Sequence, residues 1–241
     1  MATREYLRAR QGEHSLILLS AGEFAELTAR RSLTLPGRHH EHFARSLRRG
    51  DDWQAIVGDG QGLITEALVS KGEIRLSENA EPLHLLSVHH NVTLAQAWVK
   101  PKALSLILTK CAEIGVTEII LFDSEHSAPH GDSMRRMGAI IENACMQAYN
   151  PVCPQIVIAA AIADLRRETT NILFGDIEAE KDLTQPTAGQ SVMFINGPEG
   201  GFSKREITAL RAFATGVLIS ENVLRAETAA IIAAGILCLP S

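Results

Sequence analysis

The sequence has few cysteines, and none of them forms a CxxC pair. The four are Cys111, Cys145, Cys153 and Cys238. Irregular spacing of so few thiols argues against both a disulfide framework and a zinc site. We therefore expect reduced thiols in a cytoplasmic protein.

Long hydrophobic runs are also absent. The longest, AAIIAAGILCL near the C-terminus, is shorter than the roughly 20 residues that a membrane-spanning helix needs. Aromatic residues make up only 5% of the chain, while 46% is hydrophobic and 21% is charged. This composition is typical of a globular protein with no membrane association.

An excess of positive charge is missing as well. The net charge is -5, which argues mildly against a protein that coats nucleic acid. The charge is uneven, because residues 1–75 hold eleven Lys and Arg against ten Asp and Glu. A polyanion would meet this first part more easily than the rest, although its basic segment 30–51 is equally well explained as a solvated loop and helix.

The pattern of apolar residues indicates two domains. Residues 1–76 contain short strand-like segments, SLILLS and WQAIVGDGQGLITEALVS, in which GDGQG is a plausible hairpin turn. A small β-barrel or sheet fits this pattern. Composition turns polar at residues 76–83, where a proline appears, and from residue 83 to 241 strands alternate with helices. The second part therefore predicts an α/β domain with a mostly parallel sheet.

The elements expected in the second part follow from their apolar runs and end signals. Strands are expected at 84–90, 116–123, 155–160, 171–176, 191–195 and 216–220, and helices from Pro101 to Gly115, through Met137 to Ala148, from Ser203 and from Arg225.

A glycine-rich loop, NGPEGG at residues 196–201, joins a predicted strand to a predicted helix. Ser203 and Glu206 have the S-x-x-E spacing of a capping box, which fixes the helix start. The loop is thus expected at the carboxyl end of a strand, where open α/β sheets bind ligands. Its glycines leave room for a flat group such as adenine against the backbone. Neither GxGxxG nor a P-loop is present, which disfavours phosphate binding. A tight turn without function is the alternative.

A second strand-to-helix junction lies in LISENVLRAETAA, residues 218–230. Glu227 in the first turn of the helix complements the helix dipole, whereas Arg225 opposes it, which favours a separate purpose for the arginine. A surface ion pair is the alternative. Both junctions are expected at the same edge of the sheet.

A metal site is not predicted. His126 and His130 lie four residues apart, but Pro129 between them disrupts the helix that a two-histidine metal face would need.

These motifs together resemble those of a known family. NGPEGGFSKREI followed by VLRAETAA is similar to the paired signature of the RsmE family, SPOUT-superfamily enzymes that methylate uridine N3 in small-subunit (16S) ribosomal RNA. KCAEIGV at 110–116, SEHS at 124–127 and ACMQAYNPVCP at 144–154 resemble further family motifs in the same order. The resemblance covers nearly the whole chain and is strongest from residue 100 onward.

The resemblance implies a fold, a cofactor and partners. Family members have a PUA-like N-terminal barrel, here 1–76, and a trefoil-knotted methyltransferase domain, here 83–241. They act as homodimers on ribosomal RNA of the small subunit and bind S-adenosyl-L-methionine. The cofactor-binding positions implied are Phe174, Gly175, Asn196, Gly197, Pro198, Gly200, Gly201, Ile219, Ser220, Val223 and Leu224.

Catalytic and RNA-binding positions follow from the same resemblance. Arg225 is expected to steady the RNA or the developing uridine anion. Glu199 is expected to order the loop or to contact cofactor or substrate, ahead of a role as proton acceptor. The RNA-binding positions implied are Arg45, Arg48, Lys100, Lys110 and Gln147.

Several positions depart from the family pattern. His126, Asn150, Asn222 and Ser46 stand where arginine is usual, with Arg45 displaced by one, and Ser220 replaces a glycine. Each missing arginine removes a forked phosphate contact, so weaker RNA binding is expected. Two alternatives follow: another RNA target, or a ribosome-associated module that binds without catalysis.

Overall fold

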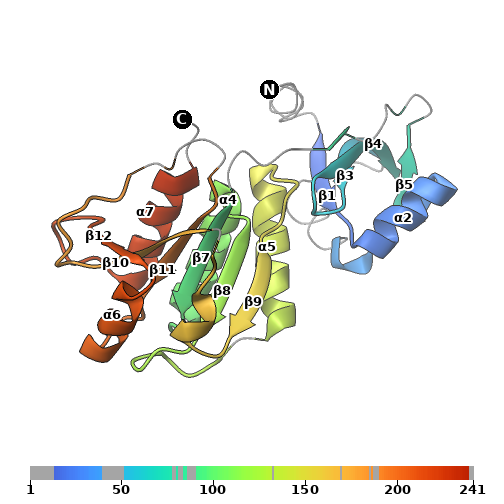
Figure 1. Cartoon of the computed structure of the whole chain (residues 1–241). Helices are drawn as coiled ribbons and strands as arrows, with labels where there is room; N and C mark the ends of the chain where they lie inside the picture. The colour runs from blue at the N-terminus through green and yellow to red at the C-terminus, as the bar shows by residue number, and fades with distance from the viewer. Residues whose placement is uncertain are drawn as a thin grey trace. The chain divides into compact units, whose positions relative to one another are not determined.

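The chain folds into two compact units, shown in Figure 1. The computed structural model describes residues 14–39, 52–77, 80, 84–85, 91–131, 133–168, 170–184, 186 and 190–238. The first unit comprises Met1–Ser87 together with Cys145–Cys153, and the second comprises Val88–Ala144 and Pro154–Ser241. The chain therefore enters the first unit twice, through a segment that the sequence analysis assigned to the C-terminal domain.

The first unit contains a six-stranded, mainly antiparallel sheet in the order β1-β3-β4-β5-β2, with β6 paired to β4. The strands are β1 (Ser15–Leu18), β2 (Ser32–Thr34), β3 (Asp52–Gly58), β4 (Leu63–Ser70), β5 (Glu73–Leu76) and β6 (His84–Leu85). GDGQG joins β3 to β4, with positive φ at Gly60 and Gly62, so the predicted hairpin is confirmed. The described strands form no closed barrel.

One helix of the first unit was not predicted. Helix α2 (Ala21–Arg30) begins at a capping box in which Glu23 donates its amide to Ser20 and accepts from the Ser20 amide. Its buried face consists of Phe24 and Leu27. This S-x-x-E signal is the same one that located the helix after Ser203, and it was overlooked in a region that otherwise indicates strands.

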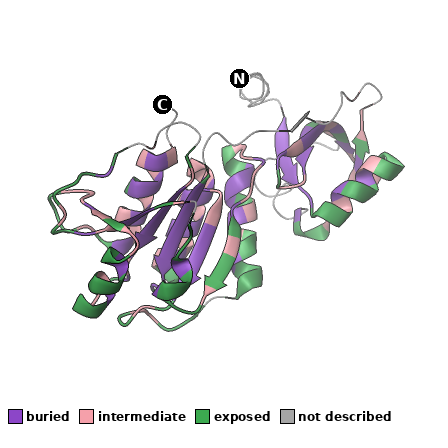
Figure 2. Cartoon of the chain, viewed as in Figure 1, coloured by how far each residue is buried: buried purple, intermediate pink, exposed green. Residues whose placement is uncertain are grey.

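The second unit is built on a six-stranded sheet that is parallel throughout, in the order β12-β10-β11-β7-β8-β9. Its strands are β7 (Val92–Ala97), β8 (Glu118–Phe122), β9 (Gln155–Ala159), β10 (Asn171–Gly175), β11 (Val192–Asn196) and β12 (Thr215–Val217). The predicted α/β class with a mostly parallel sheet is confirmed. Figure 2 shows these strands as largely buried, with the edge strand β9 more exposed.

Helices pack on both faces of this sheet. They are α4 (Pro101–Ile114), α5 (Met134–Ala148), the short η1 (Ile162–Leu165), α6 (Lys204–Arg211) and α7 (Ala226–Cys238). Helix α4 ends at Gly115, whose φ of 103° suits glycine. Alternate side chains of β7 and β11, such as Ala95 and Ile195, share one buried cluster with η1 and α6, while α4 and α7 pack against each other.

The first strand of the parallel sheet was placed wrongly by the sequence. Residues 84–90 were expected to form it, but β6 pairs with β4 of the first unit, and residues 86–90 lie outside the described part of the chain. The strand is β7 instead. All six of its residues are buried, so it lacks the alternation of polar and apolar residues by which half-buried strands are recognised.

None of the described helices is long and apolar enough to cross a membrane. The four cysteines are free thiols. Burial raises the pKa of the Cys111 thiol above its usual range, and it raises the pKa of Cys238 to about 12. Both thiols therefore remain protonated and serve the packing of α4 and α7.

Candidate functional site

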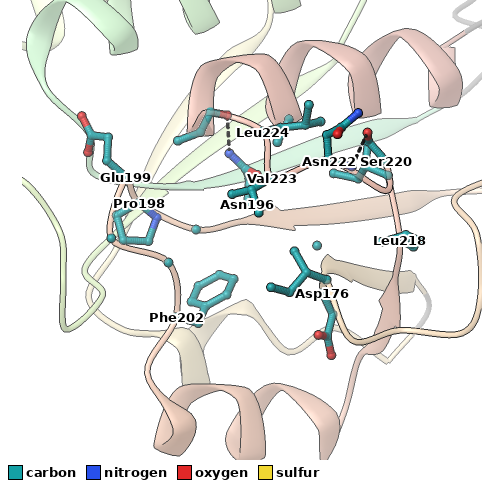
Figure 3. A pocket seen from close by; sticks show the side chains of 18 of the residues that line it. Asp176, Asn196, Pro198, Glu199, Phe202, Leu218, Ser220, Asn222, Val223 and Leu224 are labelled. Carbon is teal, nitrogen blue, oxygen red and sulfur yellow. Dashed lines mark hydrogen bonds between the residues drawn. The ribbon is translucent and has the colours of Figure 1, made fainter.

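A cavity of about 420 Å³ opens at the carboxyl ends of β10, β11 and β12. It is lined from three segments, residues 175–177, 196–202 and 218–224, together with Ile207 of α6 and the first turn of α7 (Figure 3). Parallel pairing aligns these strand ends, since Gly175 is the register partner of Val217. The expectation that both strand-to-helix junctions lie at one rim is confirmed. We call residues 197–202 the glycine loop and residues 218–225 the C-terminal loop.

The glycine loop needs its glycines for contacts within the protein. A Cβ at Gly197 would lie 3.3 Å from the ring of Phe202, and a Cβ at Gly200 would lie 3.0 Å from Cβ of His126. Gly201 has a φ of +71°, which disfavours side chains. The sequence analysis attributed these glycines to a ligand against the backbone, whereas the structure also requires them to seat the loop on its neighbours.

Side chains and backbone of neighbouring loops hold the glycine loop in place. The Lys100 amide donates to Glu199 Oε1 at 3.1 Å, and His126 Nδ1 lies 3.1 Å from the Gly201 carbonyl oxygen. Glu199 thus helps to order its loop, which is one of the roles expected for it. These contacts join the loop after β11 to the loops after β7 and β8.

Glu206 adds a tether that sequence reasoning only half anticipated. Its Oε2 accepts from the Ser203 amide at 2.8 Å, completing the predicted capping box of α6. Its Oε1 accepts from the Glu125 amide at 2.9 Å. The carboxylate is buried, and one side chain therefore both starts α6 and fixes the loop after β8.

Two buried amides lie beneath the cavity. Asn196 Nδ2 donates to Gln96 Oε1 at 2.7 Å and to the Ala226 carbonyl at 2.9 Å. Gln96 Nε2 donates to the carbonyls of Ala97 and Gly197, at 2.8 and 3.1 Å. Both Nδ2 hydrogens of Asn196 are used within the protein. The side chain can therefore only accept a hydrogen bond from a ligand, through Oδ1.

The C-terminal loop is held by fewer contacts. Its first residue, Leu218, exchanges backbone hydrogen bonds with Lys181 and Leu183. Beyond it, the Asn222 amide donates to Ser220 Oγ within the loop, at 3.1 Å. Val223 is 84% exposed at the mouth of the cavity, and Ile177 from the segment after β10 is 73% exposed. Figure 3 shows Val223 and Leu224 on the side of the cavity opposite Phe202. Exposed apolar side chains at a concave site favour a ligand with an apolar surface.

Asp176 supplies the cavity with a carboxylate that is neutralised by α6. Its Oδ2 accepts from Arg211 at 2.8 Å, and its Oδ1 accepts from the Glu178 amide at 3.0 Å. The carboxylate raises the pKa of the Arg211 guanidinium above its ordinary value. A Cβ at Gly216 would lie 3.0 Å from Asp176 Oδ2, so the glycine at 216 makes room for this pair.

Most cofactor positions implied by the resemblance line the cavity, and one does not. Phe174 is fully buried in the core cluster beneath the sheet, and the lining residue of that segment is Gly175 with its neighbours Asp176 and Ile177. Phe174 is the residue before the carboxyl end of β10, and its side chain points into the core. The sequence did not show which face of the sheet this side chain occupies. The other ten positions are all among the lining residues.

The predicted catalytic and RNA-binding residues are dispersed. Arg225 is exposed immediately before α7 and makes no ion pair with the described residues. Lys100 is exposed at the start of α4, whereas Lys110 pairs with Glu113 of its own helix at 2.7 Å. Gln147 is exposed near the end of α5. Arg45, Arg48 and Ser46 lie outside the described residues, and the RNA-binding roles remain predictions.

Residues that depart from the family pattern have local partners. His126 contacts the glycine loop as described, and Ser220 accepts from Asn222. Asn150 Oδ1 accepts from the Val152 amide at 3.1 Å. These side chains therefore make local structural contacts at positions where the resemblance expects arginine or glycine. The loss of RNA affinity remains a prediction.

The cavity suits S-adenosyl-L-methionine by its size, its glycine-lined floor and its apolar lip. Its volume lies within the roughly 300–1,000 Å³ of small-ligand pockets. Half-buried backbone at 197 and exposed backbone at 200–201 can pair with polar ligand atoms, while Val223, Leu224 and Ile177 cover apolar surface. Across the described part of the chain, no group of three or more His, Cys, Asp or Glu could hold a metal ion.

Comparison with known proteins places the chain in a family. Residues 87–238, more than half of the chain, match the RNA methyltransferase domain family. The chain belongs to this family. A ribosomal RNA small subunit methyltransferase E from Mesomycoplasma hyopneumoniae is 30% identical over 173 residues, covering 67% of this chain and 74% of the relative. One from Rickettsia conorii is 26% identical over 223 residues, covering 87% and 90%. The predicted RsmE membership is confirmed.

Solved structures of RNA methyltransferases share the fold. A ribosomal RNA small subunit methyltransferase E from Neisseria gonorrhoeae, bound to S-adenosyl methionine, superposes with a TM-score of 0.73 at 21% identity over 92% of this chain and 95% of that one. A putative methyltransferase from Legionella pneumophila, also in complex with the cofactor, gives 0.69 at 23% identity over 84% and 88%. At these identities the structures establish the fold alone.

Proposed function

We propose that the chain is an S-adenosyl-L-methionine-dependent methyltransferase of small-subunit ribosomal RNA. The observation that carries this proposal is the cavity at the carboxyl rim of the sheet, closed by the glycine loop and the C-terminal loop in a member of the RNA methyltransferase family. The rRNA substrate comes from the relatives named for small-subunit methylation, which match most of the chain.

The finer parts of the proposal rest on the family resemblance. We infer that the methylated atom is N3 of a uridine in 16S rRNA and that the enzyme acts in the cytoplasm as a homodimer. The first unit is proposed to be a PUA-like RNA-binding domain, and Arg45 and Arg48 are proposed as RNA contacts. The second unit is proposed to thread its C-terminal part as a trefoil knot. Lys100, Lys110 and Gln147 are proposed as further RNA contacts.

When bound, S-adenosyl-L-methionine supplies a methyl group on a positive sulfonium, which leaves as a neutral thioether when the methyl passes to N3. Backbone groups at Gly197, Pro198, Gly200 and Gly201 are proposed to bind its polar atoms. Ile219, Ser220, Val223 and Leu224 are proposed to cover its apolar surface from the opposite side. Gly175 lines the cavity beside them.

The protein's own residues must position the uridine and manage its N3 proton. That proton leaves to water or a base as the methyl arrives, so negative charge develops on the pyrimidine ring. Arg225 is an exposed cation beside the cavity and is proposed to stabilise this charge. Glu199 is committed to the Lys100 amide and is proposed to hold the glycine loop rather than to accept the proton. The base must be unpaired or flipped out to present N3.

Methyl transfer to ribosomal RNA tests the proposal. Small subunits from a strain lacking the gene are incubated with the purified chain and S-adenosyl-L-methionine, and the RNA is mapped by mass spectrometry. We expect one added methyl on a uridine. Binding of the cofactor by calorimetry without any methyl transfer to the RNA would overturn the enzymatic proposal and favour a binding module.

Two variants test the role of Arg225 in the same assay. Arg225→Met is expected to lower turnover by about 10²-fold, the size of losing one charge-stabilising group. Its cofactor affinity should be unchanged, because Arg225 is not among the residues lining the cavity. Arg225→Lys keeps the charge and should retain intermediate turnover. Equal turnover in all three proteins would remove Arg225 from the mechanism.

A further inference from the structure

We propose that Gln96 is a positioning residue that couples the glycine loop to the C-terminal loop. Gln96 is not among the residues that line the cavity, and nothing in its sequence context marks it as functional. Its side chain is completely buried, and that of Asn196 is nearly so, at 0% and 4% exposure. The cofactor-binding part of this inference rests on the proposed function.

The coupling follows from where the two amides lie in the sheet. Asn196 and Gln96 are register partners at the carboxyl ends of adjacent parallel strands β11 and β7. Alternation along both strands places them on the face opposite the cluster that contains Ala95 and Ile195. This is the face from which Asn196 reaches the Ala226 carbonyl at the start of α7.

The orientation of both amides is determined by carbonyl groups. The Ala97, Gly197 and Ala226 oxygens can only accept, so Nε2 of Gln96 and Nδ2 of Asn196 must face them. Gln96 Oε1 is then the acceptor for Asn196. A flip of either amide would set oxygen against oxygen in a buried site.

The chain of hydrogen bonds runs between the bases of the two loops. At one end it fixes the carbonyl of Gly197, which is the first residue of the glycine loop. At the other it fixes the Ala226 carbonyl, directly after the C-terminal loop. Because these groups are buried, leaving one unpaired costs more than the bond contributes when made. The position of one loop base therefore depends on the other, and Gln96 takes part in this coupling without lining the cavity itself.

The role of Asn196 depends on Gln96 as well. With Nδ2 spent on Gln96 and Ala226, Asn196 can offer a ligand only its acceptor oxygen. Removal of Gln96 frees one Nδ2 hydrogen and allows the amide to turn. The pocket would then lose its preference for a ligand group that donates a hydrogen bond at this point.

The test compares Gln96→Met with a matched control on the same strand. Methionine keeps the length of the side chain and removes every hydrogen bond. The control, Thr93→Val, removes a part-buried hydrogen bond, 3.0 Å long, from the buried Thr93 Oγ1 to Glu118 Oε2 at the amino end of β7. Affinity for S-adenosyl-L-methionine is measured by calorimetry well below the melting temperature of each protein, and hydrogen exchange is measured without ligand.

Gln96→Met is expected to weaken cofactor affinity by about tenfold or more, the size of one buried polar group left unpaired. Amides of both loops should exchange faster in this variant. Thr93→Val should lower the melting temperature yet leave affinity and loop exchange unchanged. The proposed coupling is wrong if Gln96→Met binds S-adenosyl-L-methionine as tightly as the parent and its amides exchange faster in only one loop or in neither.

The outcomes separate this inference from the proposed function. If the parent chain does not bind S-adenosyl-L-methionine, the proposed function fails, and the ligand-free exchange of the two loops decides the coupling alone. If Gln96→Met does not fold, Gln96→Asn replaces it. That variant keeps the amide but is one methylene too short to reach both loops, so the same loss of affinity and the same paired increase in exchange are expected.

Discussion

The two loops that close the cavity are built differently. The glycine loop is tied to its surroundings at Gly197, Glu199 and Gly201, by Gln96, the Lys100 amide and His126. The C-terminal loop has an internal bond between Ser220 and Asn222 and carries a Val223 side chain that is 84% exposed. The C-terminal loop is otherwise held at its first residue, where Leu218 exchanges backbone hydrogen bonds with Lys181 and Leu183. We therefore expect the glycine loop to be preformed and the C-terminal loop to gain contacts when a ligand binds. Ligand-binding segments are often the less stable ones.

The largest effect is expected at Asn196, which precedes the glycine loop and bonds to the residue that follows the C-terminal loop. Asn196→Leu leaves Gln96 Oε1 and the Ala226 carbonyl unpaired in the interior, so the free energy of unfolding should fall by about 2–4 kcal/mol. Chemical denaturation measures this loss. Asn171→Leu, at the exposed first residue of β10, is the control and should change stability by less than about 0.5 kcal/mol. Similar losses in both variants would contradict the special status of Asn196.

A smaller loss is expected from crowding the glycine loop. Gly200→Ala places a Cβ 3.0 Å from Cβ of His126, so the loop or its neighbour must shift, at a cost of about 1–3 kcal/mol. Gly138→Ala is the control, because a Cβ there meets nothing within 4 Å and alanine favours the interior of α5. The control should gain about 0.5–1 kcal/mol. Denaturation curves in which Gly200→Ala is neutral would show that the loop is not seated as described.

Ligand binding should separate the two loops directly. Hydrogen exchange with and without S-adenosyl-L-methionine should show about tenfold more added protection at residues 218–225 than at residues 197–202, since 1.4 kcal/mol of ordering corresponds to a factor of ten. Residues 118–122 of β8 serve as the internal reference. Equal added protection in both loops would mean that both walls are preformed or that both are ordered by the ligand.

The smallest effect concerns the exposed lip. Val223→Ser should leave the free energy of unfolding within about 0.5 kcal/mol and weaken cofactor affinity by roughly threefold to tenfold, because part of a valine side chain is no longer buried by the ligand. Val157→Ser on the edge strand β9, where Val157 is 39% exposed, should not alter affinity. Unchanged calorimetric affinity in Val223→Ser would place the ligand away from this lip.

The sequence predicted well those helix ends that are set by local signals. Pro101 and Gly115 bound α4, and the spacing of Ser203 and Glu206 gave the start of α6, because each signal acts within one or two turns. The common rim of the two junctions followed from the rule that parallel strands align their carboxyl ends. The RsmE resemblance rested on the same local motifs.

Features set by long-range register were not predicted. Strand β7 is buried on both faces, so its sequence carries no alternation, and Gln96 within it gives no sign of its partner 100 residues away. Phe174 was assigned to the cofactor site although its side chain lies in the core. Oε1 of Glu206 accepts a hydrogen bond from the amide of Glu125, 81 residues earlier in the chain. Local sequence spacing does not predict a contact over such a separation. These contacts depend on which strands become neighbours.

A crystal structure of the chain grown with S-adenosyl-L-methionine tests the central claim most directly. The account predicts the cofactor in the cavity at the carboxyl ends of β10, β11 and β12, between the glycine loop and the C-terminal loop, with Val223 covered by the ligand. Cofactor density at any other place on the chain, with this cavity empty, would contradict it.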